Sequence, residues 1–544
     1  MALKVLYALD AAKIQYYHFK AIIIAGMGLF TDAYDLFCIP PIMKLLGRVY
    51  YEDKPGPEQY QIPRVVLATM LGTALLGTVI GQLVFGRLGD RMGRRHVYGI
   101  SLILMVFSSI GCGFSFCRTK TCVLVSLGIF RFFLGLGIGG DYPLSATIMS
   151  EFANKKTRGA FVAALFSMQG LGILASSMVT MVVSQIFEAA ASKNLSTKHT
   201  PEDADIVWRL ILILGAVPAG LTYYWRMMMP ETARYTALVE NNVQQATKDM
   251  EKVLDVSISR IAEDDLINLQ QDPPSYSLLS KKFFRRHGVD LFSCATTWLL
   301  LDIAFYSSSL FQSQIYKNHL DLKDANVYEE TFKVAGFQAM VALVAAIPGY
   351  WFTVYFIDRI GRRKIQMMGF LCMGIVYFAL GIPYQYWGEH ENIGFLFLYG
   401  LTFFFANFGP NTTTFIVPAE LFPARFRSTC HGISGAMGKV GAFFGTLGFL
   451  WASHNNEPDA SHNNDPDASH NNEPEDLPRI GPMRIALVCL GVICLLGMAV
   501  TYLFTRETNG RSLEENEDED ENTELCLFRC HMDADRHPNT SVPQ

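Results

Sequence analysis

The feature that most constrains the fold is a succession of long apolar stretches separated by short charged segments. A stretch of about 20 apolar residues crosses the hydrocarbon core of a bilayer as a helix, because a helix satisfies its own backbone hydrogen bonds. Charged residues make up 17% of the chain, against about 25% in soluble domains. We predict about twelve spans, at residues 21–47, 65–88, 97–117, 122–149, 159–187, 207–229, 289–316, 332–357, 365–388, 393–417, 428–452 and 482–505.

A charged pattern occurs twice, half the chain apart. Residues 86–95 read GRLGDRMGRR and residues 356–364 read FIDRIGRRK, which places Asp90 and Asp358 at equivalent positions. Duplication inside a polytopic membrane protein is typical of secondary transporters, in which two homologous halves move against each other around a central site. The sequence therefore predicts an all-α membrane protein with two pseudo-symmetric bundles of six helices.

The duplicated charges predict a latch between the two halves. The spacing Glu-x6-Arg also recurs, with nearly the same offset as the aspartates. Because both clusters fall in short loops at one membrane surface, we expect ion pairs that close that side reversibly, each worth about 1 kcal/mol. The predicted gate residues are Asp90, Arg94, Glu151, Arg158, Asp358, Arg362, Glu420 and Arg427.

The chain divides into bundles, loops and a tail. We predict a first bundle over residues 1–229, a central loop over 230–288, a second bundle over 289–505 and an acidic tail over 506–544. Within the second bundle, residues 453–478 contain a polar octapeptide repeat and are expected to be disordered. Lys and Arg concentrate in the loops on the side of the central loop, so both termini are expected in the cytoplasm.

Charged side chains inside the predicted spans are functional candidates, because each costs at least about 2.5–3.5 kcal/mol at the centre of a bilayer. Trp298, Asp302 and Tyr306 follow one another at intervals of four and share one helix face, which predicts a polar site with an aromatic wall. The full set of such charges is Asp32, Asp35, Arg131, Asp141, Asp302 and Lys439.

Two aspartates in the first span need a compensating charge. Asp32 and Asp35 would repel each other if both were ionised, so one of them holds a proton or meets a cation. Arg131 is the expected partner. Two lone amides, Gln169 and Asn411, also lie within spans, the second beside a helix break at Gly409-Pro410.

The sequence lacks the marks of an enzyme or a metalloprotein. Its eleven cysteines have no metal-ligand spacing, and no nucleophile–base pair is evident. We therefore predict no enzymatic activity, no metal, no cofactor and no nucleic-acid partner.

Residues 139–151, GGDYPLSATIMSE, resemble the signature segment of plant and fungal proton-coupled inorganic phosphate transporters. Residues 31–35 (TDAYD), 408–411 (FGPN) and 418–423 (PAELFP) are similar to the same family. Over residues 10–515 the chain looks most like the plant high-affinity branch of the major facilitator superfamily.

This resemblance implies proton:phosphate symport across the plasma membrane by alternating access, in a lipid bilayer, and leaves homo-oligomerisation open. By resemblance, phosphate is bound by Tyr142, Gln169, Trp298, Asp302, Tyr306 and Asn411. By the same resemblance, protons travel by Asp32, Asp35, Arg131, Asp141 and Asp302, with Lys439 near Asp302.

Two other functions stay open at the level of sequence. Sugar or organic-anion symporters share the general latch motifs, although a sugar needs no buried carboxyl beside Trp298 and Tyr306. A phosphate-sensing receptor of the same fold is the other alternative, and a long cytoplasmic tail would favour it.

Overall fold

The computed structural model describes residues 6, 16–52, 60–115, 119–191, 199–254, 276–319, 325–389, 393–454 and 481–517. Most of the octapeptide loop, part of the central loop and the end of the acidic tail lie outside these residues, so the predictions made for them stay predictions.

The first half of the chain forms long helices that cover the six spans predicted there. Their bounds are α2 (Tyr16–Phe37), α3 (Ile39–Tyr50), α4 (Arg64–Met92), α5 (Arg94–Gly113), α6 (Lys120–Phe152), α7 (Arg158–Ala190) and α8 (Ala204–Met228). Two short helices of the central loop follow, α9 (Ala233–Leu238) and α10 (Val243–Leu254). Helices α2 and α3 together make the first span.

The second half repeats this plan. Its helices are α12 (Lys281–His319), α13 (Val327–Val341), α14 (Ile347–Ile360), α15 (Arg362–Gly381), α16 (Tyr384–Glu389), α17 (Ile393–Asn407), α18 (Pro410–Leu421), α19 (Arg427–His454) and α20 (Pro482–Phe504). A π-helical turn, Ala342–Ala346, joins α13 to α14. The break predicted at Gly409-Pro410 separates α17 from α18, because proline has no N–H to continue the helical ladder.

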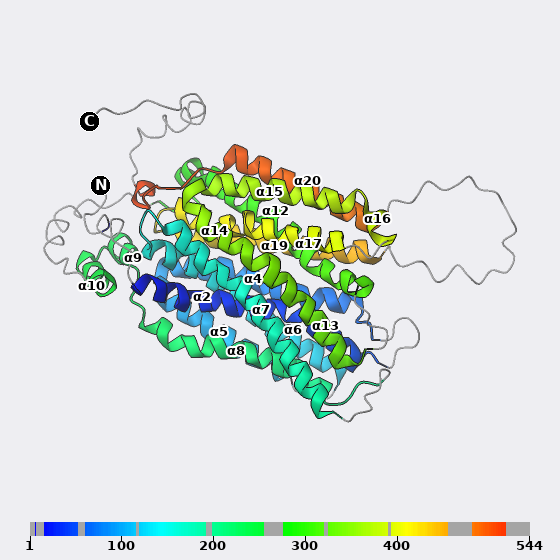
Figure 1. Ribbon diagram of the computed structural model, residues 1–544. Coiled ribbons are helices and arrows are strands. Elements are labelled where there is room, and N and C mark those ends of the chain that lie inside the picture. The colour runs from blue at the N-terminus through cyan, green and yellow to red at the C-terminus, as the bar shows by residue number, and fades with distance from the viewer. Residues whose placement is uncertain are drawn as a thin grey trace.

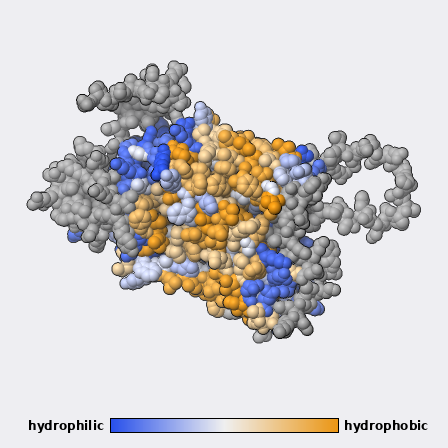
Figure 2. Space-filling model, in the orientation of Figure 1, coloured by the Kyte–Doolittle hydropathy of each residue, from blue (hydrophilic) through white to orange (hydrophobic). Residues whose placement is uncertain are grey.

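The surface of the bundle is apolar where a membrane would surround it. Among the described residues, eleven helical stretches are long and apolar enough to cross a bilayer, and α19, of 28 residues, is a further long helix packed between α4 and α12. Large apolar side chains point outward, including Phe107, Leu221 and Val344, which are 69%, 66% and 70% exposed. Figure 2 shows this apolar belt with hydrophilic surface toward both ends. The predicted all-α membrane architecture is confirmed.

The two halves meet along a seam that holds the candidate site. Helix α19 packs on α4, and α7 packs on α13 and α14, so the seam is lined from both halves. Glycine allows the closest approaches inside the first half: a Cβ on Gly135 would lie 2.1 Å from the Ala74 carbonyl oxygen of α4. In Figure 1, α9, α10 and the last described residues, in red, gather at one end of the bundle, which we call the gate end.

Candidate substrate and proton sites

Side chains from both halves converge on one small cavity at the seam. All six residues implied in phosphate binding line it, together with Lys439, Phe166 and Phe305: they are Tyr142, Gln169, Trp298, Asp302, Tyr306 and Asn411. The three residues of α12 lie there together, as the four-residue spacing on one helix face predicts. The cavity is about 10 Å³, which is at the lower limit for holding a single water. It must widen to admit an anion.

The charged part of this cavity is a buried ion pair. The Lys439 ammonium lies 3.0 Å from Asp302 Oδ2 and donates to the Tyr306 hydroxyl at 3.1 Å. The Lys439 and Asp302 side chains are only 4% and 2% exposed. Because each charge is removed from water, losing one partner would leave the other uncompensated. Neutralising Asp302 alone would therefore leave the charge of Lys439 in need of another anion.

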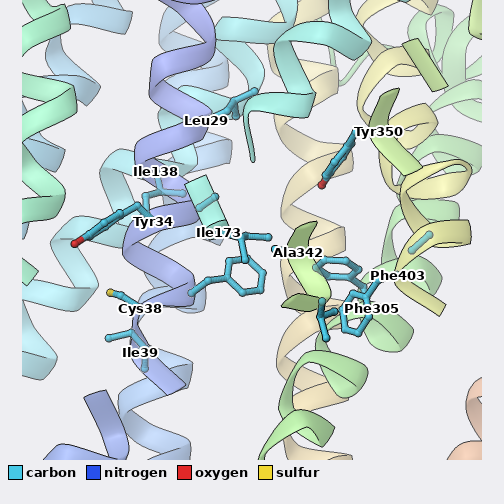
Figure 3. Close-up of a cluster of buried hydrophobic side chains, with 14 of the residues drawn as sticks. Leu29, Tyr34, Cys38, Ile39, Ile138, Ile173, Phe305, Ala342, Tyr350 and Phe403 are labelled. Atoms are coloured by element: carbon cyan, nitrogen blue, oxygen red, sulfur yellow. The ribbon is translucent and has the colours of Figure 1, made fainter. Parts of the chain in front are cut away.

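A tyrosine that sequence reasoning missed joins the two halves. Tyr350 on α14 donates to Gln169 Oε1 at 3.3 Å and accepts from Asn411 Nδ2 at 3.0 Å. Figure 3 shows its hydroxyl pointing into the space between the helices of the first half and those that carry Phe305 and Phe403. Tyr350 lies in a span with several aromatic residues, so no sequence signal singles it out.

Aromatic rings pack around the cavity. Phe166 stacks on Phe415 with ring centroids 4.4 Å apart, and Tyr142 meets Phe415 edge-on at 6.1 Å. On the other half, Trp298 contacts His431 edge-on at 5.4 Å. Rings from both halves thus interlock, and the site is closed from the surrounding solvent.

The residues implied in proton transfer fall into two separate groups. In the first, Ser109 Oγ donates to Asp35 Oδ1 at 3.4 Å, and the charge of Arg131 acts on Asp35. Arg131 itself donates through Nε to the Met70 carbonyl at 3.2 Å. Arg131 is therefore near enough to Asp35 for their charges to interact, and the role of this pair in proton transfer stays a prediction.

In the second group a different arginine takes the place expected for Arg131. Asp32 faces Asp141, and Arg226 of α8 lies 3.6 Å from Asp141. Arg226 is near the end of a predicted span, where an arginine side chain usually extends to the membrane surface. In the structure it points into the bundle instead, and the sequence alone does not indicate this.

Each gate aspartate caps a helix of the opposite half. Asp90 accepts from the backbone N–H groups of Ser428 and Thr429 at 3.2 and 2.7 Å, in the first turn of α19. Asp358 accepts from those of Gly159 and Ala160 at 3.2 and 2.8 Å, in the first turn of α7. A carboxylate at a helix N-terminus satisfies free N–H groups and complements the helix dipole. The two halves are therefore joined by reciprocal caps.

The two duplicated pairs form as their spacing predicts, with Arg94 3.4 Å from Asp90 and Arg362 2.9 Å from Asp358. The two glutamates of the gate pair differently from their spacing in the sequence. Glu151 binds Arg94 at 3.3 Å and Arg427 of the other half at 2.8 Å. Arg362 binds Glu420 at 2.8 Å. Arg158 donates through Nη1 to the Arg511 carbonyl at 3.0 Å.

The chain beyond α20 crosses this gate. Glu514, in the 3-10 turn Glu514–Asn516, accepts from Arg234 Nε of the central loop at 2.8 Å. On the other half, the amide of Asn516 donates to the Glu420 carbonyl at 2.8 Å. Burial alone would raise the pKa of Glu514, but Arg234 and a hydrogen bond from Ser512 outweigh it and lower the pKa to about 2. The segment is a strap between the halves.

Contacts also cross the seam at the opposite end of the bundle. Glu330 of α13 binds Arg48 of α3 at 3.0 Å and lies 3.7 Å from Lys44. Gln338 donates to the Phe37 carbonyl at 2.8 Å. Both ends of the seam are thus closed in this conformation.

Comparisons with known proteins agree with this architecture. A family model described as "Sugar (and other) transporter" matches residues 21–519. The chain is 61% identical to "Probable inorganic phosphate transporter 1-9" of Arabidopsis thaliana, over 95% of this chain and 96% of that protein. It is 53% identical to "Low affinity inorganic phosphate transporter 1" of Petunia hybrida, over 96% of this chain and 97% of that protein. The solved structure of the major facilitator proton:xylose symporter XylE, bound to 6-bromo-6-deoxy-D-glucose, superposes with a TM-score of 0.70 at 18% identity, covering 92% of this chain and 98% of that one; this likeness shows the major facilitator fold.

Proposed function

Because the chain belongs to the inorganic phosphate transporters within the sugar (and other) transporter family, we propose that it imports inorganic phosphate together with protons across the plasma membrane by alternating access. The gate end faces the cytoplasm in this proposal, since Lys and Arg gather in the loops there.

The observation that carries the proposal is the Asp302–Lys439 pair inside a cavity lined by neutral donors and acceptors. Dihydrogen phosphate both donates and accepts hydrogen bonds, so tyrosine, tryptophan and amide side chains can surround it. An ionised Asp302 holds Lys439 and repels an anion. A proton on Asp302 removes that negative charge and frees Lys439 to attract phosphate.

In this proposal, alternating access opens the two closed ends of the seam in turn. Proton and phosphate binding favour a closed cavity, and separation of the caps at Asp90 and Asp358 opens the cytoplasmic side. Loss of the proton from Asp302 toward the cytoplasm restores the ion pair with Lys439 and expels the anion. The latch charges are buried in this closed state, so opening the gate has to give them water or new partners in each cycle.

The alternatives fit the site less well. A neutral sugar has no use for a buried ammonium such as Lys439, and the curated relatives at 53–61% identity are named for inorganic phosphate. A receptor without transport would bind phosphate but accumulate none, so the uptake experiment separates it from a symporter.

The test is uptake of radiolabelled phosphate by yeast that lack their own phosphate transporters. We expect uptake that is strong in acidic medium, falls in alkaline medium and collapses with a protonophore. Asp302→Asn removes the titratable group and should abolish accumulation against a gradient. Asp203→Asn, the same change at an exposed position, is the matched control. Accumulation by Asp302→Asn equal to that of the control would contradict the proposal.

A further inference from the structure

A buried cluster in the first half brings together two carboxyl groups and one guanidinium. Arg226 Nη1 lies 3.6 Å from Asp141 Oδ1, and both side chains are at most 1% exposed. Asp32 is fully buried and lies within hydrogen-bonding reach of Asp141. While both are ionised, neither oxygen of Asp32 and neither oxygen of Asp141 receives a hydrogen bond.

Arg226 is held in place from several sides. Its Nε and Nη2 atoms donate to the carbonyl oxygens of Ile24 and Ala25 at 3.3 and 3.4 Å, and its guanidinium lies 4.0 Å from the ring centroid of Tyr98. Gly28, one turn before Asp32, leaves the space for the pair: a Cβ there would lie 1.9 Å from Asp141 Oδ2 and 2.2 Å from Arg226 Nη2. These contacts fix the guanidinium of Arg226 in position beside the two carboxyl groups.

The charge count of the cluster decides how many protons it takes. Two carboxylates and one guanidinium carry a net charge of −1 (−2 + 1), and one added proton makes the cluster neutral. A buried net charge is costly, and a single proton shared between Asp32 and Asp141 also supplies the missing hydrogen bond. A second proton would make the cluster positive.

The charged and titratable neighbours of the cluster come from several helices. Asp35 follows Asp32 on α2, Tyr98 contributes from α5, and Tyr142 follows Asp141 on α6. Tyr306 of α12, in the second half, also interacts electrostatically with Asp32. The cluster therefore lies near the substrate cavity, which Tyr142 and Tyr306 line.

The cluster also adjoins a hollow at the gate end. A cavity of about 280 Å³ between α2 and α8 is lined by Lys20, Ile24 and Met228 among others. Ile24 is the residue whose carbonyl binds Arg226. Ile24 is thus shared between the surroundings of Arg226 and this hollow.

We propose that Arg226 is a positioning residue that limits the Asp32–Asp141 pair to one exchangeable proton per transport cycle. The inference rests on proton-coupled uptake as proposed above. Arg226 neutralises one carboxylate, and the proton that completes the pair is taken up from the outer side and released to the gate end. Without Arg226 the pair retains protons, and the step that fails is proton release, not phosphate binding.

The experiment compares two readouts in proteoliposomes that contain the full chain. Net uptake driven by an inward proton gradient requires proton release in each cycle. Exchange of internal for external phosphate does not, because the loaded carrier returns without releasing its proton. We expect Arg226→Gln to lower net uptake by about tenfold or more while exchange persists, and to move the pH of half-maximal net uptake upward by more than about one unit.

A double variant makes the charge count testable. Asp141→Asn alone leaves one carboxylate and one guanidinium, which are neutral without a proton, so the share of proton coupling that this pair supplies is lost. Combined with Arg226→Gln, it leaves only the carboxylate of Asp32, with a net charge of −1 and room for one proton. We therefore expect the double variant to recover the net uptake that each single variant loses. Arg209→Gln, which removes another buried guanidinium of α8, is the matched control and should keep the wild-type pH profile.

Each outcome decides between the two proposals. A wild-type chain whose net uptake ignores the proton gradient overturns the proposed function itself. If wild-type uptake is driven by acid but Arg226→Gln keeps the wild-type pH dependence of net uptake, only the inference about Arg226 is overturned. If Arg226→Gln loses phosphate exchange and the double variant does not recover net uptake, Arg226 has a merely structural role. That result also overturns the inference.

Discussion

The strap beyond α20 provides a quantitative prediction about the gate. Glu514 and Arg234 meet at 2.8 Å, and their side chains are 7% and 0% exposed. Glu514→Gln keeps an acceptor but removes the charge. A hydrogen bond to a charged group contributes about 1.5–3 kcal/mol and a neutral one about 0.5–1.5 kcal/mol, so the variant should weaken the closed gate by about 1–2 kcal/mol. Since about 1.4 kcal/mol is a factor of ten, the open population should rise about tenfold.

The assay uses a thiol placed behind the gate. Ser428 is fully buried at the seam, where its backbone N–H is capped by Asp90. In a Ser428→Cys background, the rate of modification by a thiol reagent on the cytoplasmic side reports how often the gate opens. We expect this rate to rise about tenfold in Glu514→Gln.

A neighbouring acid serves as the matched control. Glu515 pairs with Lys155 at 3.5 Å, but these side chains are 53% and 38% exposed, and an exposed pair contributes little. Glu515→Gln should therefore leave the modification rate within about twofold of the parent. Equal rates in the two glutamine variants would refute the idea that the buried pair holds the gate.

The pKa of Glu514 also predicts how the strap responds to pH. A carboxyl whose pKa is lowered to about 2 contributes stability that is fully present above its ordinary pKa of 4.5 and is lost as the pH falls through about 2. Cytoplasmic pH changes between about 6 and 8 therefore leave this contact intact. The strap contact at Glu514 is therefore not the source of any acid activation of uptake.

Three further predictions concern other parts of the seam. Tyr350→Phe removes the hydroxyl between Gln169 and Asn411 and should raise the KM for phosphate about fivefold, a loss of about 1 kcal/mol; an unchanged KM would remove Tyr350 from the site. Glu330→Gln, at the opposite end, should favour the outward-open state and slow the thiol reaction of Ser428→Cys, whereas a faster reaction would contradict the assignment of that contact to the outer gate. Asp358→Asn weakens the cap on α7 by about 1 kcal/mol and should speed the same reaction about fivefold; no change would show that the reciprocal caps do not limit opening.

Much of the architecture and part of the site were predictable from local patterns. Apolar length predicts spans because a bilayer tolerates only hydrogen-bonded helices, and the helices of both halves cover the predicted ranges. Helical periodicity places Trp298, Asp302 and Tyr306 on one face, and they line one cavity. The duplicated charges indicate where a latch lies. The roles of the buried cavity and cluster residues in phosphate and proton transfer stay proposals.

Only the tertiary structure decided which partners meet. The same buried carboxylate pattern is compatible with Arg131 or Arg226 as the cation of Asp32, and helix packing brings Arg226 to that group. The gate aspartates were expected to form ion pairs, yet they also cap helices of the opposite half. The reason is physical: sequence spacing specifies which residues share a helix face, whereas the distance between atoms on different helices depends on how the whole bundle packs.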